Sequence, residues 1–169
     1  LSEMLLGWLQ RYPIVAIEDP LGEDDADAMA KFTLAAGNKI EIVADDFICT
    51  TQAKIESAQS IGACNTALIK PNQEGTLTES KAALDAARLA GWESLVSARS
   101  GETEDVTIVH LAVGWGVKQL KVGSFTRSER MAKWNECLRI QDTLGRDAFV
   151  GGAPLANTWW GRKNNGEQR

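Results

Sequence analysis

Five short apolar runs in this chain each stop at a polar or charged side chain, and the stops are almost evenly spaced. They fall at Glu18, Asp45, Lys70, Ser97 and Lys121, with steps of 27, 25, 27 and 24 residues between them. The stops supply two acidic sites and two lysines. Carboxylates are hard ligands that suit Mg2+, and a lysine can act as a base when nearby cations disfavour its protonated form. We therefore interpret these residues as parts of one functional site and not as scattered polar positions.

The even spacing predicts a repeating structural unit. A step of about 25 residues holds one strand, one helix and two loops, which makes each step a βα unit. The runs are continuous and apolar, as is typical of parallel strands buried on both faces. Functional groups of such folds lie at the carboxyl ends of the strands. The expected strands are residues 14–17, 40–44, 66–69, 94–97 and 119–122.

Helical patterns fill the intervals between these strands. The helix at 76–90 has the strongest signals, because Thr76 and Glu79 form a capping-box pattern and Gly91 follows its end. The helix at 102–113 is expected to open with acidic residues, which suit the positive N-terminal end of a helix. The expected helices are residues 1–11, 24–36, 51–61, 76–90, 102–113 and 127–144.

The predicted fold class is α/β, with about five βα units, parallel strands and helices outside. Right-handed βα units build either a doubly wound sheet or a barrel. A complete eight-unit barrel takes roughly 200–250 residues, so five units would form part of a (β/α)8-type barrel. Its open strand edges should be covered by something else. We assign residues 1–145 to this portion and residues 146–169, with the pair Trp159–Trp160, to a tail of low order.

The composition excludes several classes of partner. The chain has 169 residues, a net charge of −5 and no basic patch of the kind that binds nucleic acid. No apolar run approaches the roughly 18 residues that a membrane span needs. The three cysteines form no CxxC pair, which predicts reduced thiols in a cytoplasmic protein. The six tryptophans are interpreted as core or interface groups.

Five sequence motifs carry a resemblance to a known family. They are IEDP (17–20), ADD (44–46), KPNQEGTLTE (70–79), SARSGETED (97–105) and LKVGSFTRSER (120–130). In this order and at this spacing, they closely resemble the C-terminal part of enolase, or phosphopyruvate hydratase, over about residues 12–144. The resemblance implies the fourth to eighth strands of an eight-stranded α/β barrel, which makes the chain a C-terminal half-barrel.

The resemblance also implies a role for each stop in the dehydration of 2-phosphoglycerate to phosphoenolpyruvate, a glycolytic reaction. Glu18 and Asp45 are similar to the family's Mg2+ ligands, and Lys70 to the base that takes the C2 proton. Arg99 and Ser100 match the pair that binds the phosphate, and Lys121 matches the lysine that holds the carboxylate. This implies Mg2+ as cofactor and a phosphorylated carboxylate as substrate.

The chain departs from the family pattern in three places. Family members carry histidine where this chain has Ala98, and Pro71 and Glu74 are also unusual. The resemblance places the third metal carboxylate and the acid-side glutamates in segments that this sequence does not contain. Because two carboxylates seldom hold Mg2+ tightly by themselves, we expect the isolated chain to be inactive.

Three interpretations stay open at this point. The chain is a portion of an enolase-type lyase, or a non-catalytic truncated paralogue that assembles as a homo-oligomer or with a complementing barrel half. A lyase for another carboxylate is a third option, which the pair Arg99–Ser100 disfavours. Asp46 is interpreted as a helix-capping or supporting group, and His110 as a structural rather than a catalytic residue.

Overall fold

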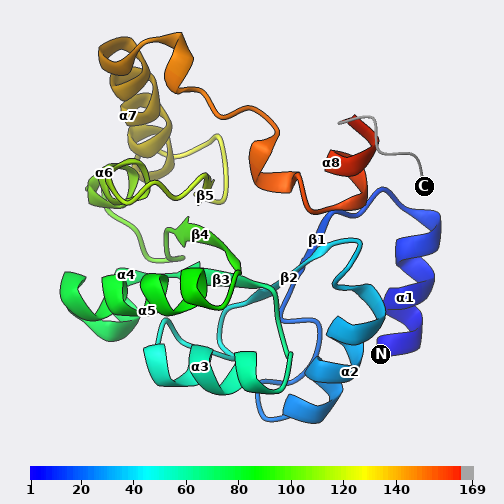
Figure 1. Ribbon diagram of the computed structural model, residues 1–169. Helices are drawn as coiled ribbons and strands as arrows, with labels where there is room; N and C mark the ends of the chain where they lie inside the picture. The colour runs from blue at the N-terminus through cyan, green and yellow to red at the C-terminus, as the bar shows by residue number, and fades with distance from the viewer. Residues whose placement is uncertain (165–169) are drawn as a thin grey trace. The chain divides into compact units, whose positions relative to one another are not determined.

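The computed structural model describes residues 1–164, and these fall into two compact units. The first unit contains residues 1–94 and the described residues from Leu155 onward, and the second contains Leu95–Pro154. Both are drawn in Figure 1, coloured along the chain. The second unit is therefore an insertion in the sequence of the first.

The first unit alternates short strands with helices. Its strands β1 (Ala16–Glu18), β2 (Glu41–Ala44) and β3 (Thr66–Ile69) are parallel, with Ile17 opposite Ile42 and Val43 opposite Thr66. β3 has its predicted bounds, and the ends of β1 and β2 lie within two residues of theirs. The helices of this unit are α1 (Ser2–Arg11), α2 (Ala26–Ala36), α3 (Gln52–Ser60), α4 (Pro71–Glu74), α5 (Leu77–Leu89) and α8 (Trp159–Asn164).

The second unit continues the same alternation. Strand β4 (Glu93–Ser97) begins in the first unit, where the Glu93 N–H donates to the Asn65 carbonyl at 3.1 Å. It then pairs in parallel with β5 (Gln119–Lys121), and the strand order of the sheet is β1-β2-β3-β4-β5. The remaining elements are α6 (Thr107–Gly114), α7 (Ser128–Leu144) and the 3-10 turns Arg146–Ala148 and Ala153–Leu155. The predicted class, α/β with five parallel strands of a partial barrel, is confirmed.

The core of the first unit lies around β2 and β3, whose residues are all buried. Ile42 and Leu68 are fully buried, as are Met29 of α2 and Leu84 of α5. Each such side chain contributes about 1.5–3 kcal/mol by leaving water. β1 does not follow the expectation of burial on both faces, since Ala16 and Glu18 are exposed. It is the first strand in the order, so it has a neighbouring strand on one side only.

The acidic stretch before α6 is not helical, which corrects the prediction of a helix over residues 102–113. The helix begins at Thr107, whose N–H donates to the Asp105 side chain at 2.8 Å. Glu102 lies in the loop before this helix, where its carboxylate accepts the Arg99 N–H and pairs with Lys133. Thr76 caps the N-terminus of α5 as predicted, because its hydroxyl accepts the Glu79 N–H at 3.1 Å, and the same hydroxyl donates to the Glu79 carboxylate at 2.7 Å.

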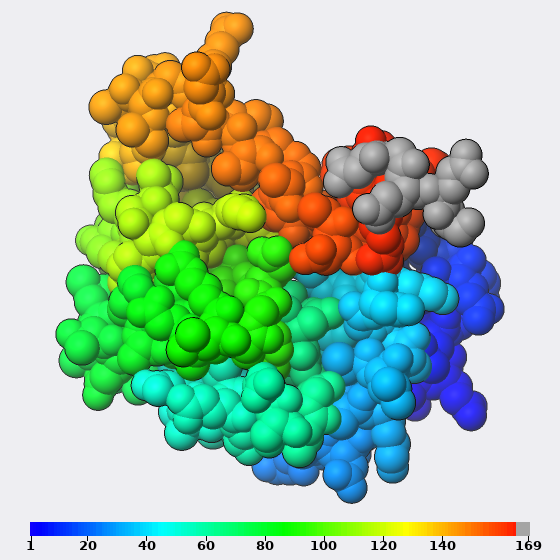
Figure 2. Space-filling model, in the orientation of Figure 1, coloured from blue at the N-terminus to red at the C-terminus, as the bar shows by residue number. Residues whose placement is uncertain are grey.

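The segment after Pro154 belongs to the first unit and contacts the N-terminal part of that unit. The Trp159 indole N–H donates to the Ile14 carbonyl at 2.6 Å, and its backbone N–H donates to the Lys39 carbonyl at 2.7 Å. Thr158 and Gly161 are buried. In Figure 2 the red segment lies against blue and cyan residues of the same unit. The predicted low-order tail, residues 146–169, thus includes a helix with these contacts, and its residues 165–169 lie outside the described part.

None of the helices in residues 1–164 combines the length and apolarity that a membrane crossing requires. The three cysteines, Cys49, Cys64 and Cys137, are free thiols. Burial, with a smaller contribution from the charge of Asp19, raises the pKa of Cys64 to about 12. Burial also raises the pKa of Cys137.

We expect Cys64 to resist alkylation while the chain is folded. The thiolate is the reactive form, so at pH 8 iodoacetamide should modify Cys64 on the order of 1,000-fold more slowly than the partly exposed Cys49. Peptide mass spectrometry over a time course measures both rates, and labelling in urea supplies the control in which all three cysteines react. Equal rates in the folded chain would contradict the burial of Cys64.

Candidate functional site

The predicted residues of the first unit lie on one face of the sheet. Glu18 is opposite Val43, and Val43 is opposite Thr66. Side chains alternate along a strand, so positions two and four residues further on keep the same face. Asp45 and Lys70 therefore share the face of Glu18, and each lies just past the end of its strand.

Asp45 and Lys70 form a buried ion pair. The Lys70 ammonium donates to Asp45 Oδ2, and their side chains are only 11% and 9% exposed. Removing two charges from water costs several kcal/mol per ion, which close pairing offsets. The two predicted residues are thus in direct contact.

The hydroxyl of Thr50 and the unusual backbone conformation around it hold Lys70 in place. Its N–H donates to the Thr50 hydroxyl at 2.9 Å, and that hydroxyl donates to the Gln73 side-chain oxygen at 2.6 Å. Thr50 is fully buried and has φ +57°, following Cys49 at φ +47°. A positive φ is an outlier for a β-branched residue, and such strain persists only where surrounding contacts determine it. Thr50 was not among the predicted site residues.

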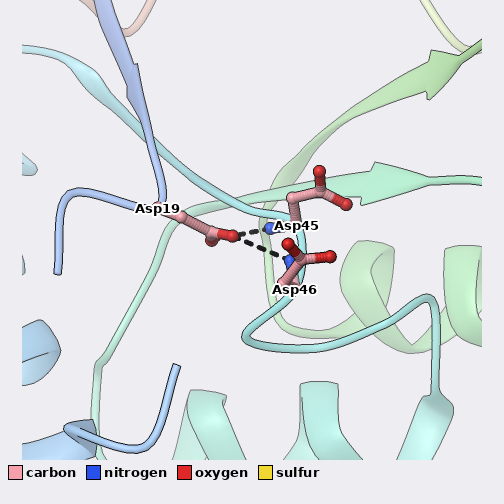
Figure 3. A group of neighbouring side chains, drawn as sticks. All are labelled: Asp19, Asp45 and Asp46. Carbon is pink, nitrogen blue, oxygen red and sulfur yellow. Dashed lines mark hydrogen bonds between the residues drawn. The ribbon is translucent and has the colours of Figure 1, made fainter. Parts of the chain in front are cut away.

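Three aspartates cluster beside this pair. Asp19 Oδ1 accepts the Asp45 N–H at 2.9 Å, and Asp19 Oδ2 accepts the Asp46 N–H at 2.8 Å (Figure 3). Asp19, Asp45 and Asp46 can each place a carboxylate oxygen within 4.8 Å of the others. Asp19 was not among the predicted site residues. It directly follows Glu18 and has a left-handed backbone conformation (φ +39°), which Asp adopts more readily than most residues.

The electrostatics of this cluster favour a positive charge. Burial raises the pKa of Asp19 and outweighs the two N–H groups that lower it, and the charges of Asp45 and Asp46 raise it further. Asp45 Oδ1 is buried and has no hydrogen-bond partner among the described residues. A buried carboxylate oxygen without a donor suits a metal ion, and an all-carboxylate set suits a hard cation such as Mg2+. The donor set present is therefore of the kind that a hard divalent cation prefers.

The two predicted metal ligands differ in their surroundings. Asp45 is buried within the aspartate cluster, whereas Glu18 is exposed at the end of β1 and is not a member of that cluster. Asp46, predicted as a capping or supporting group, belongs to the cluster, and its own carboxylate is exposed. Figure 3 shows the Asp46 and Asp45 side chains emerging from the same segment after β2.

The predicted residues of the second unit follow its two strands. Lys121 is opposite Ser97, and the Ala98 N–H donates to the Lys121 carbonyl at 2.9 Å. Arg99 comes next in the chain, with its N–H bound to Glu102 Oε1 at 2.7 Å. Ser100 is exposed. These residues therefore lie at the carboxyl ends of neighbouring strands, as the spacing predicts.

Ala98 and His110 also have defined surroundings. Ala98, which occupies the family's histidine position, is 8% exposed. His110 lies on α6 with its Nε2 atom 3.0 Å from Glu136 of α7, and its side chain is 56% exposed. The pair joins α6 to α7.

Comparison with known proteins gives two results. The family model described as "Enolase, C-terminal TIM barrel domain" matches residues 1–158. A protein named Enolase 2 from Hevea brasiliensis is 44% identical over 153 residues, which cover 90% of this chain and 34% of that protein. The chain thus spans about a third of the length of this relative.

Loss of the Asp45 carboxylate should destabilise the first unit. The Asp45→Ala variant leaves the Lys70 ammonium buried without its counterion, so we expect the free energy of unfolding to fall by about 3–5 kcal/mol. The matched control is Asp46→Ala, which removes an exposed carboxylate from the next residue and should cost less than about 0.5 kcal/mol. Urea unfolding followed by circular dichroism measures both, and equal losses would refute a stabilising pair.

Proposed function

Because this chain belongs to the enolase family, we propose that it forms the C-terminal half of a Mg2+-dependent lyase site. The reaction is the dehydration of 2-phosphoglycerate to phosphoenolpyruvate. The observation that carries the proposal is the contact of Asp45 with Lys70, in a chain that keeps the family motifs in order. A divalent-cation ligand and a lysine base are the two groups that such a reaction needs side by side.

Asp45 and Glu18 would hold the metal, with the Asp19 and Asp46 carboxylates adding negative charge beside Asp45. When bound, Mg2+ would offset the negative charge that develops on the substrate carboxylate as the C2 proton leaves. Asp19 orients the segment after β2 by accepting the N–H groups of both Asp45 and Asp46. Its role in the proposed site is therefore to position the Asp45 carboxylate.

Lys70 is an ammonium paired with Asp45 in this structure, so it would first have to lose a proton, which a cation held at Asp45 would favour by disfavouring the charged amine. Its amine nitrogen would then take the proton from C2. The electron pair of the broken C–H bond then forms the C2–C3 double bond as hydroxide leaves C3, so the products balance as phosphoenolpyruvate and water. Arg99 and Ser100 would bind the phosphate through charge-assisted and hydroxyl hydrogen bonds. Lys121 would pair with the substrate carboxylate. Acidic groups from the rest of the family's barrel would protonate the departing hydroxide.

A second candidate function is a non-catalytic one. Ala98 favours it, because an alanine methyl group cannot make the contacts of the family's histidine. In this case the chain would act as a cytoplasmic enolase-like subunit whose end strands pair with a second copy or with a complementing barrel half. The exposed residues of β1 fit such a pairing.

Complementation tests the lyase proposal. The chain would be mixed with a separately produced N-terminal portion of an enolase, and phosphoenolpyruvate formation would be followed by its ultraviolet absorbance. We expect activity that EDTA abolishes and Mg2+ restores, and a loss of about 1,000-fold in Lys70→Ala. The matched control is Lys81→Ala, which removes a partly exposed lysine of α5 paired with Asp85. A folded complex without Mg2+-dependent turnover would refute the proposal.

Sedimentation tests the second candidate. If the end strands pair between copies, the chain alone should sediment at micromolar concentration as a dimer or larger assembly. Adding the N-terminal portion should convert that assembly to a mixed complex. A monodisperse monomer across this concentration range would argue against pairing of half-barrels.

A further inference from the structure

Lys133 of α7 is a fully buried lysine outside the predicted site. Its side chain is 0% exposed, and its ammonium pairs with Glu102 Oε2 at 2.7 Å. It also donates to the carbonyls of Thr103 at 2.7 Å and Glu129 at 3.0 Å. An ammonium has three N–H donors, so these three acceptors match its full capacity. Two of them belong to the loop between β4 and α6.

Glu102 links this buried charge to the proposed phosphate-binding pair. One carboxylate oxygen binds Lys133, and the other accepts the Arg99 N–H at 2.7 Å. A single carboxylate therefore connects the backbone of Arg99 to α7. The loop is therefore held at Arg99, through the Glu102 carboxylate, and at the Thr103 carbonyl, which accepts from Lys133.

Arg130, one helical turn before Lys133, holds the same loop at a third point. Its Nη2 atom donates to the Ser100 carbonyl at 2.9 Å, and its Nη1 atom donates to the Val122 carbonyl at 2.9 Å. Val122 directly follows Lys121. The two arms of one guanidinium thus join the loop that carries Ser100 to the strand end that carries Lys121.

We propose that Lys133 and Arg130 are positioning residues that set the Arg99–Ser100 loop for phosphate, an inference that rests on the proposed function. Stability alone gives a weak reason for this arrangement, because an apolar pair of similar volume is usually at least as stable as a buried ion pair. Both cations instead bind the loop between β4 and α6: Lys133 binds it at Glu102 and Thr103, and Arg130 binds it at Ser100. Phosphate binding by an arginine and a serine depends on their exact placement, which mobile loop backbone would not provide.

The first test uses inorganic phosphate as the probe. We expect Lys133→Met to bind it about 10-fold more weakly than the parent in calorimetric titration, because the Arg99 loop loses its fixed position. The matched control is Arg139→Met, which removes an exposed cation of the same helix and should change the affinity less than about 2-fold. Equal affinity of Lys133→Met and the parent would overturn the proposal.

Two further variants cover other outcomes. If Lys133→Met does not fold, Arg130→Lys keeps the charge but cannot reach both the Ser100 and Val122 carbonyls, and should also weaken phosphate binding. Arg99→Met separates this inference from the proposed function. If Arg99→Met binds phosphate as the parent does, the phosphate role itself is wrong. If it loses binding while the Lys133 and Arg130 variants keep theirs, only the positioning role is wrong.

A pH titration gives a readout that loss of stability would not produce. Burial acts to raise the pKa of Glu102, but the bonds from Lys133 and the Arg99 N–H, with the charges of Lys133 and Arg130, lower it below its usual value. The Arg99 amide signal in NMR should therefore shift at a pH below the usual carboxylate range, and at a higher pH in Lys133→Met. The Ala28 amide of the first unit, which donates to the Asp25 side chain at 3.1 Å, is the internal control. An unchanged Arg99 midpoint would overturn the proposal.

Discussion

The buried ion pair between Asp45 and Lys70 is the interaction on which the polar edge of the first unit depends. β2 and β3 are buried and largely apolar, so the residues that follow them enter surroundings poor in water. Neither charge is well tolerated there by itself, and together they offset each other. Because parallel strands end at the same edge, the two residues meet without any long loop to bring them together. The chemistry of the site thus follows from strand register.

The neighbouring residues extend this logic to the backbone. Asp19 fixes the segment after β2 by accepting two successive N–H groups, and Thr50 fixes the start of α4 by accepting the N–H of Lys70. In the second unit, Glu102, Arg130 and Lys133 do the same for the loop after β4. In both units the groups proposed to meet substrate lie on short loops whose backbone is held by charged or hydroxyl side chains.

Sequence reasoning predicted the strands and the polar residues at their ends, since a buried apolar run and its abrupt end are local features. It could not identify Asp19, Thr50 or Lys133, because their importance comes from partners far away in sequence. Lys133 is an example: in the sequence it is one of several charged residues of a long helix, and only its contacts with Glu102 and Thr103 mark it as buried. The same contacts explain why the acidic stretch at 102–106 is loop rather than helix, since Glu102 binds Lys133 instead of helping to start a helix.

The path of the chain has a consequence for how the protein matures. The first unit contains residues 1–94 and the described residues after Pro154, and Trp159 contacts both Ile14 and Lys39. During synthesis, the N-terminal residues leave the ribosome long before Trp159 does. The surface around Ile14 and Lys39 therefore stays uncovered while the 60 intervening residues are translated, at about 5–20 residues per second. A surface exposed for several seconds during synthesis is one to which chaperones can bind.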